Sequence, residues 1–186
     1  KGFEPNWVRG EIPKDSYRSI FKWGNPLEIK PPKESLFRLM KEKFGMTDAD
    51  FQTYKENIGF DKVQFDLPIS LKERDLDAFR AIVGGDFVRT DDYARLSVAY
   101  GKTMYDLLRL RNKIVENVPD AVLYPDTKEQ IEQIVAYCEE HRIPVYVYGG
   151  GSSVTRGVEC MKGGISLDMR LRFNKRSEEH TSELQS

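Results

Sequence analysis

The sequence predicts an α+β fold, in which a helical N-terminal extension precedes a strand–helix–strand unit with a small parallel sheet. Three observations support this prediction. Helix-period apolar patterns dominate the first 117 residues, short β-rich runs appear only from Val118 onward, and one amphipathic helix lies between the first two strand candidates. A strand, a helix and a strand with short links form a right-handed crossover, which makes the two strands parallel.

The composition is that of a folded protein without a strong charge bias. Of the 186 residues, 39% are hydrophobic and 32% are charged, and the formal net charge is −1. This balance gives no electrostatic reason to expect nucleic acid or an anionic membrane surface as a partner. The sequence contains no apolar run long enough to span a bilayer. Its two cysteines form no C-x-x-C pair, so we expect a reducing cytoplasm.

Residues 1–117 are expected to form the helical extension. Residues 1–32 are punctuated by prolines and are expected to be irregular. Beyond them, apolar residues at helical spacing predict helices over residues 34–44, 47–57, 70–83, 91–100 and 103–115. Ser70 and Glu73 have the spacing of a capping box, and Thr47 is expected to cap the helix that it precedes.

The strand–helix–strand unit follows. Ala121–Tyr124 is a short apolar strand candidate, and the next candidates are residues 143–148 and 165–168. Thr127 and Gln130 have capping-box spacing at the start of the intervening helix. That helix is expected to bury a face formed by Ile131, Ile134, Val135 and Cys138.

The most informative stretch is the loop after the second strand, where residues 148–154 read Tyr-Gly-Gly-Gly-Ser-Ser-Val. A loop without Cβ atoms adopts positive φ readily and lets another group approach its backbone. Its N–H groups can converge on an anion, and the ligand we expect is the pyrophosphate of a dinucleotide. The G-x-G-x-x-G fingerprint fails because its third glycine position is Val154, and no Walker Gly-Lys-Ser/Thr follows. The loop alone leaves open a sharp turn without a ligand.

Other candidate sites are few. Cys138 lies on an apolar helical face and is expected in the core. Cys160 is a candidate reactive thiol, with Arg156 and Lys162 as nearby cations. His141, near a helix end, is expected to be a surface or capping residue rather than a catalytic base.

Residues 119–125, the helix after them and residues 148–154 resemble the FAD-binding domain of the vanillyl-alcohol oxidase and p-cresol methylhydroxylase superfamily. Within that superfamily, the chain is most similar to the alkylglycerone-phosphate synthases and their bacterial FAD-linked oxidase relatives. Residues 95–101 and 106–111 resemble the helical lead-in of that family. Residues 164–168 resemble the strand that follows its flavin loop.

The resemblance implies a domain organisation and a cofactor site. Residues 1–117 would be the helical extension, and residues 118–175 the first lobe of a truncated PCMH-type FAD-binding domain. The loop would wrap the FAD pyrophosphate with backbone N–H groups and hydroxyls, its site residues being Val147, Tyr148, Gly149, Gly150, Gly151, Ser152 and Ser153. Some members of the superfamily tether the flavin through a histidine near this loop. None lies here, so we expect non-covalent FAD.

The function that the resemblance implies is FAD-dependent oxidation of a small hydroxylated substrate. Two alternatives stay open: redox-neutral alkyl exchange, as in an alkylglycerone-phosphate synthase of ether-lipid synthesis, and a non-catalytic nucleotide-binding module. The catalytic residues are unknown, and the resemblance places them downstream. The chain is therefore expected to be an N-terminal fragment that is inactive alone. A homodimer of the full-length protein stays open as well.

Residues 176–186 are expected to be an artificial tail. They are polar, have no apolar periodicity and are similar to the translation of a common sequencing adapter.

Overall fold

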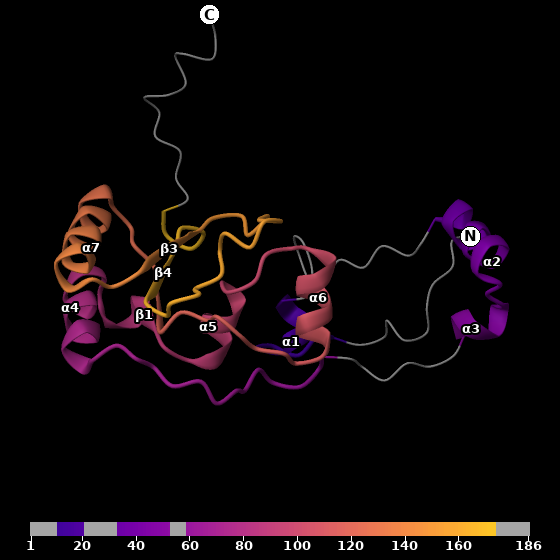
Figure 1. The fold of residues 1–186 in the computed structure, drawn as a ribbon, viewed down its shortest axis with the longest axis horizontal. Helices are drawn as coiled ribbons and strands as arrows, with labels where there is room; N and C mark the ends of the chain where they lie inside the picture. The colour runs from indigo at the N-terminus through magenta and orange to yellow at the C-terminus, as the bar shows by residue number, and fades with distance from the viewer. Residues whose placement is uncertain (1–10, 21–32, 53–58, 174–186) are drawn as a thin grey trace, which may run out of the picture. The chain divides into compact units, whose positions relative to one another are not determined.

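The computed structural model describes residues 11–20, 33–52 and 59–173. Residues 176–186, expected to be an artificial tail, lie outside this described part. The chain divides into two compact units: Lys1–Val63 with Leu107–Ile114, and Gln64–Asp106 with Val115–Ser186. Of the helices described (Figure 1), none combines the length and the apolar character needed to cross a membrane.

The first unit contains α1 (Tyr17–Ile20), α2 (Glu34–Phe44) and α3 (Asp48–Gln52). The sequence predicted α2 at these bounds, and the helix ends at Gly45 with a left-handed φ of 63°. Thr47 caps α3 as predicted, because its hydroxyl accepts the backbone N–H of Asp50 at 3.4 Å. Besides these helices, an isolated antiparallel bridge pairs Ser16 with Lys62.

The second unit combines helices with a four-stranded sheet. The helices are α4 (Glu73–Val83), η1 (Gly85–Phe87), α5 (Asp92–Ser97), α7 (Lys128–His141) and α6 (Met104–Arg111), whose C-terminal part is assigned to the first unit. The strands are β1 (Val88–Arg89), β2 (Ala121–Leu123), β3 (Val145–Tyr148) and β4 (Ile165–Asp168).

The sheet has the strand order β1-β2-β4-β3. β4 pairs in parallel with both β2 and β3, and β1 pairs antiparallel with β2. The α+β class, the three strands predicted from the sequence and their parallel arrangement are confirmed. The sequence analysis did not anticipate β1, nor that β4 lies between β2 and β3.

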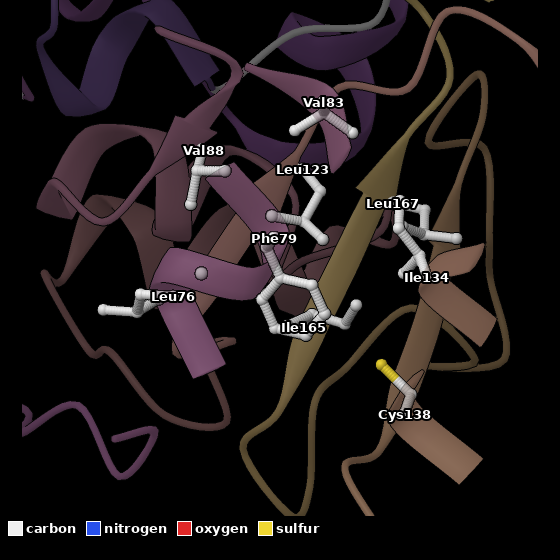
Figure 2. Packing of buried hydrophobic residues seen from close by; sticks show 10 residues of the cluster. Leu76, Phe79, Val83, Val88, Leu123, Ile134, Cys138, Ile165 and Leu167 are labelled. Atoms are coloured by element: carbon white, nitrogen blue, oxygen red, sulfur yellow. The ribbon is translucent and has the colours of Figure 1, made fainter. Parts of the chain in front are cut away.

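One face of the sheet carries the larger core. Helices α4 and α7 lie side by side over it (Figure 1), and their apolar side chains meet those of β2 and β4. Figure 2 shows Phe79 of α4 pointing toward Ile165 of β4, with Ile134 of α7 beside Leu167. Phe79, Ile134 and Ile165 are each 0% exposed. Burial of this kind is the main force that stabilises the sheet against its helices.

The opposite face is covered by α5. Successive strand residues point to opposite faces, so Val122 lies with Ala94 of α5 and with Val98, which follows this helix, rather than with the α4–α7 core. Tyr148, the last residue of β3, and Val158 join this second cluster. The unit therefore has three layers, with the sheet in the middle.

Several helices differ from the sequence prediction: α1 lies in a stretch expected to be irregular, and α5 and α6 are shorter than residues 91–100 and 103–115. Two helix caps differ as well. Ser70 and Glu73 form no capping box, because α4 begins at Glu73 and the Ser70 backbone N–H donates to Asp120 at 2.9 Å. Thr127 does cap α7, accepting the N–H of Gln130 at 3.2 Å. The Gln130 side chain, however, accepts the N–H of Asp126 instead of returning to Thr127.

The predicted buried face of α7 is only partly right. Ile134 and Cys138 are buried, but Val135 is 45% exposed. The helix therefore faces α4 and the sheet with a narrower stripe than its sequence suggested.

This difference gives a stability test on one helix. Ile134→Ala should lower the free energy of unfolding by about 2–5 kcal/mol, because it removes buried methyl groups and leaves a cavity. Val135→Ala is the matched control and should change it by less than about 0.5 kcal/mol. Urea unfolding followed by circular dichroism measures both. An equal loss of unfolding free energy in the two variants would contradict the packing of α7 described here.

Candidate functional site

The glycine loop lies at the carboxyl edge of the parallel strands. It begins after Tyr148 of β3, whose side chain is 1% exposed, while Gly149 and Gly150 are exposed and Gly151 is buried. In sheets with parallel strands, ligands bind outside the carboxyl ends of the strands. The fold therefore places the predicted site residues where a ligand is expected.

Gly151 is required by the turn itself. Its φ of 65° is left-handed, and a Cβ at this position would lie 2.1 Å from the Tyr148 hydroxyl oxygen. Any other residue would displace the buried tyrosine or the turn.

Gly149 and Gly150 differ from Gly151 because nothing in their own structure demands glycine. A Cβ at either position would meet no atom within 4 Å, and neither has a left-handed φ. The space beside them is open, so a ligand can approach the main chain closely.

The loop also presents hydrogen-bond donors. Among the described residues, none accepts a hydrogen bond from the backbone N–H groups of Gly149 to Ser152. The Ser152 side chain is exposed, and the Ser153 hydroxyl accepts the Gly157 N–H at 3.2 Å. Val147 is 61% exposed. Open space beside several available N–H groups is an arrangement that can bind an anion.

Two residues that the sequence analysis missed stand beside the loop. Arg170 follows β4, and its Nε and Nη2 donate to the two carboxylate oxygens of Asp168 at 2.9 and 2.5 Å. Its guanidinium carbon lies 4.5 Å from the centroid of the Tyr148 ring. The hydrogen bonds to Asp168 raise the pKa of Arg170, so its positive charge is secure. The sequence signal that could have identified Arg170 is a basic residue just after a predicted strand.

Lys102 approaches the loop from its other end. Its backbone N–H donates to the Ser153 carbonyl oxygen at 3.1 Å. Burial lowers the pKa of the Lys102 ammonium, the charge of Arg170 lowers it further, and Asp106 opposes both.

The cysteines do not form a site. Both are buried, and burial raises the pKa of Cys138 and of Cys160 to about 12. Cys138 lies in the core as predicted. The candidate reactive thiol at Cys160 is wrong, because burial disfavours the thiolate that reactivity needs.

His141 has a structural role at the end of α7. Its ring stacks on Tyr137 with centroids 4.0 Å apart, and its Nδ1 lies 2.9 Å from the Tyr137 carbonyl oxygen. This agrees with the expected role at a helix end. Within the described part of the chain, no group of three or more His, Cys, Asp or Glu side chains could hold a metal ion.

A separate hollow lies at the amino ends of the strands, away from the glycine loop. It has a volume of about 240 Å³, and Asp120, Pro144 and Gly164 are among its lining residues. Each of these three precedes a strand of the sheet. The glycine loop is thus an open edge rather than one wall of this hollow.

A known protein family matches the part of the chain that contains the sheet and the glycine loop. Residues 119–185 match the family described as FAD binding domain. The match covers the whole strand–helix–strand unit and the glycine loop. It also continues through residues 176–185, whose artificial origin stays a prediction.

Relatives support the family and extend the similarity upstream. An alkyldihydroxyacetonephosphate synthase of Trypanosoma brucei brucei is 31% identical over 147 residues, which are 75% of this chain and 24% of the synthase. A mitochondrial D-lactate dehydrogenase [cytochrome] of Arabidopsis thaliana is 36% identical over 55 residues, 30% of this chain and 10% of that enzyme. The chain thus spans about a quarter or less of the length of these relatives.

A solved structure of an alkyldihydroxyacetonephosphate synthase shares the fold. It superposes with a TM-score of 0.55 at 29% sequence identity, covering 58% of this chain and 22% of that one. Residues 119–185 therefore match an FAD binding domain, and the chain is similar in sequence and fold to alkyldihydroxyacetonephosphate synthases.

Proposed function

We propose that this chain is the pyrophosphate-binding part of a longer FAD-dependent enzyme that acts on a small hydroxylated substrate. The observation that carries the proposal is the glycine loop, which has open space beside Gly149 and Gly150 and available N–H groups from Gly149 to Ser152. FAD would supply the redox chemistry, and the loop residues would bind and orient it.

The loop residues would divide this work. The main-chain N–H groups of Gly149, Gly150, Gly151 and Ser152 would donate to phosphate oxygens, and the exposed Ser152 hydroxyl would assist. Tyr148 would act from beneath, because its buried ring sets the position of Gly151. Ser153 would fix the far end of the loop through Gly157 and Lys102.

Two reactions fit an enzyme of this kind. The first is oxidation of a hydroxylated substrate, as the name of the D-lactate dehydrogenase indicates for that relative. The second is redox-neutral alkyl exchange of the alkyldihydroxyacetonephosphate synthase type. The similarity to the trypanosomal synthase covers 75% of this chain and reaches beyond the FAD segment, which supports the second reaction as the alternative.

Alanine variants of the glycine loop test the site in the full-length protein. Gly149→Ala and Gly150→Ala should leave the melting temperature unchanged, since their Cβ atoms meet nothing. Each should weaken FAD binding about tenfold or more, because the methyl group occupies the space of the ligand and costs a charge-assisted hydrogen bond. Titration of the apoprotein, followed by flavin fluorescence, measures the affinity.

Two further variants serve as controls. Gly85→Ala adds a methyl group in open space at η1, away from the loop, and should change neither stability nor affinity. Gly151→Ala should lower the melting temperature, because it strains the turn and meets Tyr148. Wild-type FAD affinity in both Gly149→Ala and Gly150→Ala would exclude the loop as the phosphate site.

The flavin should be dissociable. No histidine lies in the sequence near the loop, so acid precipitation of the full-length protein should release all yellow colour into the supernatant. Yellow colour retained in the pellet after washing would indicate a covalent bond and contradict this prediction.

Anaerobic mixing with substrates separates the two reactions. A hydroxylated substrate that is oxidised should bleach the visible absorption band of the flavin, and the band should return with an electron acceptor. Alkyl exchange should give product with no net bleaching at steady state. A full-length protein that purifies without flavin and does not bind added FAD would support the non-catalytic module instead.

A further inference from the structure

Two residues with cationic side chains lie beside the glycine loop, one at each end. Arg170 lies over the ring of Tyr148, the residue that precedes Gly149. Lys102 is tied by its backbone to Ser153, the last of the predicted loop residues. The two come from different parts of the chain, the segment before α6 and the segment after β4, and the fold brings each of them to one end of the loop.

Contact between the main chains holds Lys102 in place. A Cβ on Gly101 would lie 2.1 Å from the Ser153 carbonyl oxygen, so the backbone before Lys102 packs directly on the loop. This approach fixes where the Lys102 side chain begins. Arg170 is fixed by its two hydrogen bonds to Asp168. Both cationic residues are therefore held next to the loop by contacts of their own segments.

The two acidic side chains nearest these cations are buried. Asp168 is 2% exposed on its side chain, whereas the Arg170 side chain that it holds is 46% exposed. Asp106, which stabilises the charge of Lys102, is 1% exposed. Its carboxylate accepts the backbone N–H of Thr103 at 3.2 Å. The Arg170 guanidinium is therefore more accessible to a ligand from solvent than the carboxylate that holds it.

We propose that Lys102 and Arg170 are phosphate-anchoring residues, which hold the two negative charges of the FAD pyrophosphate at the glycine loop. This rests on the proposed function, and it adds to it two charged residues outside the loop. An anion between two cations relieves the repulsion between them and strengthens every hydrogen bond from the loop. The glycines provide the shape and the N–H donors, and Lys102 and Arg170 provide the charge.

The test compares charge variants of the full-length apoprotein. Lys102→Gln should weaken FAD binding about tenfold or more, the expected loss of one charge-assisted contact. Lys102→Arg should restore most of the affinity, since it keeps the charge. The matched control is Lys162→Gln, which removes one exposed positive charge in the hollow at the amino ends of the strands and should leave the affinity unchanged.

Arg170 is tested together with its partner. Arg170→Gln alone would leave the buried Asp168 carboxylate without its guanidinium and could unfold the sheet edge. The double variant Asp168→Asn with Arg170→Gln removes both charges at once. It should fold, as measured by its melting temperature, and should bind FAD about tenfold or more weakly.

A second readout identifies the phosphate as the group recognised. ADP and adenosine are each used to compete with FAD. Lys102→Gln should weaken the competition by ADP as much as the binding of FAD, and should leave that by adenosine unchanged. Wild-type affinity for FAD and ADP in both Lys102→Gln and the double variant overturns the anchoring role and leaves the flavin site standing. A wild-type apoprotein that binds no FAD instead removes the proposed function itself.

Discussion

The position of β4 between β2 and β3 is the constraint on which the described sheet depends. All four residues of β4 are buried, and both neighbouring strands pair with it in parallel. β2 and β3 share no ladder of their own in the strand order. Ile165 and Leu167 fix β4 from one side by packing against α4 and α7. Asp168 ends the strand at the same edge where β3 ends, so the pairing brings Arg170 next to Tyr148.

The glycine loop shows how one short segment meets two different demands. Gly151 serves the fold, since its left-handed φ and the neighbouring Tyr148 hydroxyl exclude a side chain. Gly149 and Gly150 leave room for a ligand, since a side chain at either position would meet no atom of the protein within 4 Å. Rigidity at one end of the loop and open access at the other are what a preorganised anion site requires, because little conformational freedom is then lost on binding.

Sequence reasoning succeeded where the deciding signals were local. The bounds of α2 and β4 and the Thr127 cap of α7 all follow from residues within one turn or one strand. Sequence reasoning failed where a residue far away in the sequence determined the local structure. Asp120 accepts a hydrogen bond from the Ser70 backbone N–H, so the expected capping box does not form. The two-residue β1 is defined by its pairing with β2, which lies more than 30 positions further along the chain. The glycine loop was predictable for the same local reason. Lys102 and Arg170 were not predicted, because each lies beside the loop only in the folded chain.

The close contact between Gly101 and Ser153 bears on how such proteins can be recombined. Residues upstream of the strand–helix–strand unit form part of the surface against which the loop is shaped. A chimaera that grafts only residues 118–175 onto another scaffold would carry the glycines without that surface. The transplantable piece instead starts at Gln64, where the compact unit containing the sheet begins.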